Sequence, residues 1–325
     1  MNENEKFLKV ENLRVEYQSE GEVVHAVNGV SFSLEKGKTL GLVGETGAGK
    51  TTIAKAIMGI LPEIQAKIPE GNIFLEGKDL LRAPEKEMLK VRGSKISMIF
   101  QDPMTALNPV HRVGEQIAEA VRLHSEGSKK DAEKRAREML EMVGIPAERY
   151  KEYPHQFSGG MKQRVVIAMA LACNPELLLA DEPTTALDVT IQAQVLDMIQ
   201  SLKQKLNTSM IMITHDMGIV AEVCDDVAVI YAGQIVEYGS KEHIFDHPTH
   251  PYTVGLFGAI PSFEADVDRL SPVDGMPPNP ADLPKGCYFA PRCKYCKPEC
   301  ENPVDMVEIE PGHLCRCCNI SQREG

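Results

Sequence analysis

The sequence lacks long apolar runs and an excess of basic residues, and each absence excludes a class of function. No window of about 18 residues is uninterruptedly apolar, so we expect no transmembrane helix. The first residues are polar and acidic, unlike the start of a secretory signal, so we expect a cytoplasmic protein. Lysine and arginine total 35 against 47 aspartates and glutamates, a formal charge of −12, which argues against nucleic acid or anionic lipid as the main partner.

Cysteine is scarce over most of the chain and concentrated at its C-terminal end. The clustered cysteines are Cys287, Cys293, Cys296, Cys300, Cys315, Cys317 and Cys318. Without export, clustered thiols indicate a metal or cluster site before disulfides. We expect Cys173 and Cys224, which stand alone, to be small buried packing residues. At 325 residues the chain is long enough for one large domain and an appendage.

A glycine-rich turn lies between a predicted strand at residues 39–43 and a predicted helix at residues 53–57. The turn consists of Gly44, Glu45, Thr46, Gly47, Ala48, Gly49, Lys50, Thr51 and Thr52. Its glycines let backbone N–H groups close around a polyphosphate, and the helix N-terminus adds positive potential. Lys50 can neutralise outer phosphate oxygens, and the Thr51 hydroxyl can bind Mg²⁺. The pattern predicts a polyphosphate site.

Two adjacent carboxylates, Asp181 and Glu182, follow an apolar run at residues 177–180. This run and residues 210–213 are typical of fully buried parallel strands, and α/β sheets place ligands beyond the C-terminal ends of such strands. We expect Asp181 to hold Mg²⁺ through water and Glu182 to polarise an attacking water. Phosphoryl transfer needs charge neutralisation and an aligned nucleophile, which Lys50, Mg²⁺ and Glu182 would supply.

Residues 157–161 place a hydroxyl and two glycines ahead of an apolar helical run. Two interpretations stay open. Ser158 is an ordinary helix cap, or Ser158, Gly159 and Gly160 form a second anion site that binds the γ-phosphate of a nucleotide held by another subunit.

The remaining patterns outline the organisation of the chain. Alternating apolar and polar positions predict antiparallel strands at residues 8–17 and 26–34. Apolar positions at helical spacing predict an amphipathic helix at residues 128–143, in an α-helical insertion. Two strands around a turn are expected at residues 227–238, and the proline-rich residues 261–284 predict a semi-rigid linker.

Taken together, these motifs resemble the nucleotide-binding subunit of an ATP-binding cassette (ABC) transporter. Residues 44–52 resemble the Walker A motif, residues 177–182 Walker B, and residues 157–161 the family's signature motif. The matches occur in the family's order over most of the chain. The resemblance implies that the chain binds and hydrolyses ATP with Mg²⁺.

The resemblance also assigns roles to four further residues. Gln101 resembles the Q-loop glutamine, which contacts Mg²⁺ or the attacking water and reports the nucleotide state to the membrane partner. His215 resembles the switch histidine, which contacts the γ-phosphate and holds the water in line. Asp188 belongs to the D-loop match at residues 186–188, and Tyr17 matches the aromatic residue that stacks on adenine.

For the fold, the resemblance implies an α/β, ABC-type P-loop NTPase over residues 1–260, with a RecA-like mixed sheet core, an antiparallel β subdomain and an α-helical subdomain at about residues 103–170. A small Cys-rich metal- or cluster-binding tail would occupy residues 261–325. The family further implies a head-to-tail dimer with a second ATPase subunit, either a paralogue or a second copy. Two transmembrane permease subunits and an extracellular solute-binding protein would complete the importer, with this chain on the cytoplasmic face of the membrane.

Finer features resemble the branch that serves dipeptide and oligopeptide importers. Met161 takes the fifth place of the signature, where the general pattern has glutamine. Residues 250–253, 259–261 and 286–293 resemble that branch's C-terminal segment. Nickel and glutathione importers share the branch and stay open as alternatives, because no residue of this chain contacts the cargo. A soluble ABC ATPase acting on ribosomes or DNA repair complexes is disfavoured by the single cassette and the acidic composition.

The branch's tail pattern implies a [4Fe-4S] cluster, with zinc as the alternative. The cysteines that fit its spacing are Cys287, Cys293, Cys300 and Cys317, the last shortly after His313. Cys296, Cys315 and Cys318 are additional, and Cys315 could replace Cys317 as a ligand. We expect the cluster to be structural, because the short tail has too little apolar content for a core of its own.

Overall fold

The computed structural model describes residues 6–19, 21–125, 127–185, 187–258 and 273–319. The chain divides into two compact units. The first comprises Met1–Leu34, Leu40–Leu81 and Thr214–Gly325, and the second comprises Glu35–Thr39 and Arg82–Ile213. Each unit is therefore assembled from segments that are far apart in the sequence.

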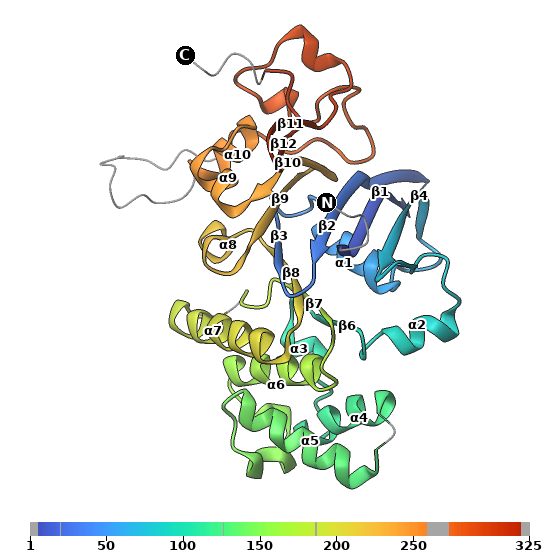
Figure 1. Ribbon diagram of the computed structural model, residues 1–325, viewed down its shortest axis with the longest axis vertical. Helices are drawn as coiled ribbons and strands as arrows, with labels where there is room; N and C mark the ends of the chain where they lie inside the picture. Colours follow the sequence, from blue (N-terminus) through green and yellow to red (C-terminus); the bar gives the residue numbers. More distant parts are fainter. Residues whose placement is uncertain (1–5, 20, 126, 186, 259–272, 320–325) are drawn as a thin grey trace. The chain divides into compact units, whose positions relative to one another are not determined.

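An antiparallel sheet of the first unit is formed near the N-terminus (Figure 1). Its strands, in the order β2-β1-β4-β5, are β2 (Glu22–Glu35), β1 (Lys6–Ser19), β4 (Ala66–Leu75) and β5 (Lys78–Asp79). Leu8 and Val10 of β1 are buried and lie opposite Leu75 and Ile73 of β4. The strands predicted at residues 8–17 and 26–34 are confirmed as neighbours in this sheet.

The other strands of the first unit follow the order β11-β12-β10-β9-β3. Their bounds are β3 (Thr39–Val43), β9 (Asp226–Tyr231), β10 (Gln234–Ser240), β11 (Val307–Glu310) and β12 (His313–Cys315). β3 pairs with β9 in parallel, whereas the other pairs are antiparallel. Every residue of β3 is buried, which fixes the strand that leads into the glycine-rich turn. The cysteine-rich tail supplies β11 and β12.

Short helices complete the first unit. They are α1 (Lys50–Met58), α8 (Met217–Val223), α9 (Lys241–Asp246), α10 (Pro251–Phe257) and the 3₁₀ turns η4 (Ala290–Arg292) and η5 (Pro298–Glu301). The match at residues 259–261 and the predicted linker up to residue 272 lie outside the described residues. Residues 273–284 contain turns and no helix or strand, and the linker stays a prediction.

In the second unit, three strands pair in parallel in the order β8-β7-β6. Their bounds are β6 (Ile96–Ile99), β7 (Leu177–Asp181) and β8 (Ser209–Thr214). All residues of the three strands are buried, because apolar side chains alternate onto both faces of the strands. The two buried parallel strands predicted from the sequence are confirmed, and Asp181 is the last residue of β7.

Helices make up the rest of the second unit. They are α2 (Glu85–Val91), α3 (Pro103–Ala106), α4 (Val113–His124), α5 (Lys129–Met142), η2 (Ala147–Lys151), η3 (Pro154–Gln156), α6 (Gly159–Leu171) and α7 (Val189–Leu206). α4 and α5 pack side by side, and α6 contacts both (Figure 1). Ser128 and Asp131 form a reciprocal capping box at the start of α5, which confirms the helix predicted at residues 128–143. Nowhere in the described ranges does a helix reach the length and apolar character that crossing a bilayer requires.

Candidate functional site

The glycine-rich turn joins β3 to α1. At two of its positions, Gly44 and Gly49, the surrounding backbone leaves no room for a side chain. A Cβ at Gly44 would overlap the carbonyl oxygen of Ile230, and a Cβ at Gly49 would overlap that of Ala26. Gly49 also has a φ of +99°, which L side chains rarely adopt. Because α1 begins at Lys50, the positive end of its dipole lies at the turn.

The side chain of Lys50 is hydrogen-bonded to the backbone of the glycine-rich turn. Its side chain is buried, and Nζ donates to the carbonyl oxygens of Gly44 at 2.7 Å and Glu45 at 2.9 Å. Thr51 and Thr52 are half-buried in the first turn of α1, and the Tyr17 hydroxyl donates to Thr52 Oγ1 at 3.4 Å. The structure therefore brings Tyr17 and the glycine-rich turn together within the first unit.

The two carboxylates differ in environment. Asp181 is buried, with 3 % of its surface exposed, whereas Glu182 is half-buried. Glu182 adopts the left-handed conformation, with φ of 46°, and its N–H donates to the Ile213 carbonyl at 2.9 Å. Such a conformation costs about 1–3 kcal/mol in a non-glycine residue and is typical of functional sites.

The Glu182 carboxylate is oriented by its neighbours in the second unit. Gln101 Nε2 donates to Glu182 Oε2 at 2.8 Å, and Thr185 Oγ1 donates to the same oxygen at 2.9 Å. Gln101 thus contacts the predicted catalytic carboxylate directly. Thr185 was not predicted, although a hydroxyl three residues beyond Glu182 is a pattern that could have indicated it.

The signature segment begins α6. Ser158 is its N-cap, with Oγ accepting from the Met161 N–H at 3.4 Å, so the helix-cap interpretation is confirmed and the anion site stays a prediction. Gly159 is exposed with open space around it, whereas a Cβ at Gly160 would lie 2.7 Å from Ile191 of α7. Gly160 therefore also has a packing role.

Two further predicted residues lie at the starts of helices. Asp188 caps α7, its Oδ1 accepting from the Ile191 N–H at 3.0 Å. Ala186, also part of the D-loop match, lies outside the described residues. His215 is exposed and lies between β8 and α8, in the first unit.

Arg149 organises the signature segment and was missed by sequence analysis. Its guanidinium donates to Glu152 Oε2 at 2.8 Å, to the Gln156 carbonyl at 3.1 Å and to Met161 Sδ at 3.3 Å. It also lies 4.3 Å from the centre of the Phe157 ring. No sequence pattern indicates Arg149, because these contacts come from separate turns of the chain.

The tail cysteines gather around one small cavity. Its lining includes Cys287, Cys293, Cys300, Cys317 and Cys318. Burial raises the pKa of the Cys287 thiol to about 11 and raises that of Cys293. Four of these five cysteines are those that fit the branch's spacing. Cys315 lies in β12 and does not line the cavity.

The predicted metal-binding character of the tail is not supported by the side-chain geometry. Within the described ranges, no group of three or more His, Cys, Asp or Glu side chains has an arrangement that could hold a metal ion. All nine cysteines are free thiols. Cys224 is buried as expected, but Cys173 is only half-buried, its thiol 3.5 Å from the Ala120 carbonyl oxygen.

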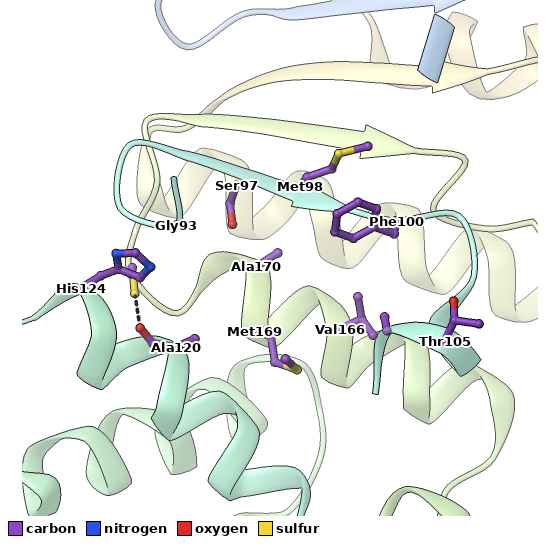
Figure 2. A pocket seen from close by; sticks show the side chains of 12 residues that line it. Gly93, Ser97, Met98, Phe100, Thr105, Ala120, His124, Val166, Met169 and Ala170 are labelled. Carbon is purple, nitrogen blue, oxygen red and sulfur yellow. Dashed lines mark hydrogen bonds between the residues drawn. The ribbon is translucent and has the colours of Figure 1, made fainter. Parts of the chain in front are cut away.

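An apolar pocket of about 480 Å³ lies among β6, α3, α4 and α6 of the second unit (Figure 2). Figure 2 shows Phe100 at the end of β6 and Val166 and Met169 on α6 at this pocket. Phe100 is 41 % exposed and directly precedes Gln101. Phe100 at this pocket is therefore joined by one peptide bond to Gln101, whose side chain orients Glu182.

Comparison with known proteins identifies the family of this chain. The ABC transporter family model matches residues 27–185, and the model for the oligopeptide/dipeptide transporter C-terminal region matches residues 236–300. The dipeptide transport ATP-binding protein DppD of Bacillus subtilis (strain 168) is 54% identical over 323 residues, which cover 98% of this chain and 96% of that protein. The oligopeptide transport ATP-binding protein OppD of Haemophilus influenzae is 49% identical over 312 residues, 95% of this chain and 96% of that protein.

A solved structure shares the fold. The dimeric post-hydrolysis state of an ATP-binding cassette bound to ADP and Pi superimposes with a TM-score of 0.65 at 26% identity, covering 72% of this chain and 98% of that one. The chain therefore belongs to the ABC transporter family, as an ATPase of the group that includes the dipeptide and oligopeptide transport ATP-binding proteins.

Proposed function

We propose that this chain is the ATP-hydrolysing subunit of an importer that takes up dipeptides or oligopeptides, and that it works on the cytoplasmic face of the membrane. One observation carries the proposal: similarity to the peptide transport ATP-binding proteins extends over nearly the whole chain, tail included. Nickel and glutathione are the alternative cargoes, and no residue described here favours them.

We assign the chemical steps to the residues of the two units. Lys50 and the α1 N-terminus bind phosphate oxygens, and Glu182 polarises the attacking water. Thr51, Gln101 and Asp181 would hold Mg²⁺, Asp181 through water. Bound Mg²⁺ would neutralise charge on the phosphates. Gln101 holds the Glu182 carboxylate through its 2.8 Å hydrogen bond, so a displacement of Gln101 would change the orientation of the base.

Other predicted residues would act on the same nucleotide or on that of a second subunit. Tyr17 stacks on adenine and His215 contacts the γ-phosphate. Ser158, Gly159 and Asp188 lie at helix starts exposed to solvent, where they are accessible to a nucleotide carried by a partner ATPase. The related cassette that was solved with ADP and Pi is itself dimeric, which supports this arrangement.

Mutation of Lys50 and Glu182 tests the ATPase assignment. Lys50→Ala should abolish ATP binding, because the ammonium that faces the phosphates is lost. Glu182→Gln should retain ATP and accumulate as a dimer while hydrolysis falls about 100-fold or more, the usual contribution of a general base. Glu176→Gln, at a surface salt bridge with Lys36, should hydrolyse ATP normally. Undiminished hydrolysis by Glu182→Gln would refute its role.

We propose that the pocket at Phe100 receives a cytoplasmic helix of the permease. Its apolar lining suits the apolar face of an amphipathic helix. Because the pocket lies beside Gln101, movement of the permease helix would shift Gln101 and so change the orientation of Glu182. In the opposite direction, ATP binding would shift the permease helix. The solute-binding protein then delivers cargo on the opposite side of the membrane.

For the tail, we propose a [4Fe-4S] cluster bound by Cys287, Cys293, Cys300 and Cys317, with zinc as the alternative. Support comes from the shared cavity that these thiols line and from their spacing. Ligation would require the thiolate forms, whose formation burial opposes until a cation is bound.

Anaerobic purification tests the cluster. The protein should be brown, with visible absorbance that is lost in Cys287→Ser and kept in Cys296→Ser, an exposed cysteine outside the cavity. Colourless protein with one zinc per chain would establish the alternative. Colourless protein without metal would contradict both.

A further inference from the structure

A salt bridge joins the cysteine-rich tail to the glycine-rich turn inside the first unit. Arg292, which directly precedes Cys293, donates from Nη1 and Nη2 to the two carboxylate oxygens of Glu45 at 2.8 and 3.0 Å. The Arg292 side chain is 5% exposed and that of Glu45 28%. Bidentate pairs of this kind are stronger and more specific in geometry than ordinary hydrogen bonds.

Arg292 uses every donor that it has. Nε donates to the Asp274 carbonyl at 2.9 Å, Nη2 also donates to the Val273 carbonyl at 2.9 Å, and Nη1 also lies 3.3 Å from the Tyr231 hydroxyl. Together with Glu45, these acceptors account for all of the guanidinium N–H groups. Arg292 is therefore fixed in one position, which a surface arginine is not.

Glu45 is held at three points in the turn. Arg292 binds its carboxylate, its N–H donates to the Tyr252 hydroxyl at 2.9 Å, and its carbonyl accepts from Lys50 Nζ at 2.9 Å. Tyr252 is fully buried and packs against Phe289 of the tail, with ring centres 5.5 Å apart. A continuous set of contacts thus leads from the tail through Glu45 to Lys50.

The negative charge of Glu45 makes its pairing with Arg292 important for the binding of phosphates at the turn. A carboxylate beside bound phosphates repels them and weakens binding, whereas a carboxylate paired with a guanidinium adds almost no net charge. We propose that Arg292 is a positioning residue for ATP: it neutralises and fixes Glu45, and so keeps the turn suited to a triphosphate. This inference rests on the proposed function, because it requires that ATP binds at Lys50.

The affinity of the full-length chain for a fluorescent ATP analogue with Mg²⁺ tests the inference. Arg292→Gln should raise the Kd about fivefold, because Glu45 is left unpaired. Glu45→Gln added to Arg292→Gln should return the Kd to within about twofold of wild type, which loss of structure alone would not produce. Arg292→Lys keeps the charge without the bidentate geometry and should raise the Kd about twofold.

Arg316→Gln is the matched control in the tail. Arg316 donates to the carbonyls of Ile235 at 3.1 Å and Val304 at 2.8 Å, so it anchors the tail away from the turn. The Kd of Arg316→Gln for the ATP analogue should stay within about twofold of the wild-type value. Thermal unfolding without nucleotide shows whether each variant is folded. If Arg292→Gln is not folded, the Kd of Arg292→Lys is the measurement that tests the inference.

The inference would be overturned by wild-type affinity in Arg292→Gln, by no recovery in the double variant, or by an equal loss in Arg316→Gln. A loss in Arg292→Lys as large as that expected for Arg292→Gln would exclude neutralisation as the cause. Failure of the wild-type chain to bind ATP, or binding by Lys50→Ala, would instead overturn the proposed function.

Discussion

Gln163 connects the signature helix α6 to the loop that follows Asp181 and Glu182. Its side chain is 2% exposed, and Nε2 donates to the Pro183 carbonyl at 2.6 Å. Pro183 directly follows Glu182, so a shift of α6 is transmitted to Glu182 through one peptide unit. Arg149 holds the preceding segment through Met161. Arg149 and Gln163 therefore link the start of α6 to two other parts of the chain.

Replacement of Gln163 tests this connection. Gln163→Leu fills the same space but leaves the Pro183 carbonyl without its donor, so the free energy of unfolding should fall by about 1–3 kcal/mol. ATP hydrolysis should also fall. Urea unfolding measures the first effect, with Gln204→Leu, an exposed position on α7, as the control. Equal stability of the two variants would contradict the assigned contact.

Among the elements, β12 attaches the tail to the rest of its unit through a buried pair. His313 Nε2 lies 2.8 Å from Glu237 Oε1, and the two side chains are 1% and 0% exposed. Glu237 also accepts from the N–H groups of Thr249 and His250, at 2.7 and 2.8 Å. One carboxylate thus joins β10, the start of α10 and β12. In the sequence, His313 belongs to the spacing pattern of the tail cysteines, whereas in the structure its side chain pairs with Glu237.

His313→Ala would remove one of the three hydrogen-bond partners of the buried Glu237 carboxylate. We expect the attachment of β12 to weaken by about 3 kcal/mol, the usual cost of breaking a buried pair. Amide hydrogen exchange should accelerate in β11 and β12 while β7 and β8 stay protected. Glu310→Gln, whose carboxylate is exposed and 3.9 Å from His243, is the control and should change little. Unchanged exchange in β12 of His313→Ala would contradict the prediction.

On the scale of the whole molecule, the proposed function requires this ATPase to bind a membrane partner. The pocket at Phe100 lies beside Gln101, and its volume of about 480 Å³ is large enough for several side chains. Because most of its lining is apolar, apolar contact would be the main source of affinity there.

Phe100→Asp should therefore impair assembly with the permease. A charge in an apolar contact must be desolvated without a partner, so copurification with the permease should fall at least about tenfold. Leu123→Asp, at a leucine of α4 that is 74% exposed and outside the pocket, should copurify normally. Equal recovery of both variants would show that the partner binds elsewhere.

The sequence by itself determined the elements whose signals are local. Glycine spacing at residues 44–49 requires a close approach of backbone, apolar runs at β7 and β8 require burial on both faces, and helical spacing with a capping box defines α5. The same local patterns located Lys50, Asp181 and Glu182. The division of the chain at residue 261 stays a prediction.

Only the tertiary structure decided the contacts between distant segments. Arg292 lies 247 positions beyond Glu45, and Glu237 lies 76 positions before His313, so no periodicity or motif predicts that they meet. Such pairs form because a buried polar group must find a partner wherever the packed chain provides one. For this reason the tail, which the sequence presents as an appendage, is bonded to the glycine-rich turn.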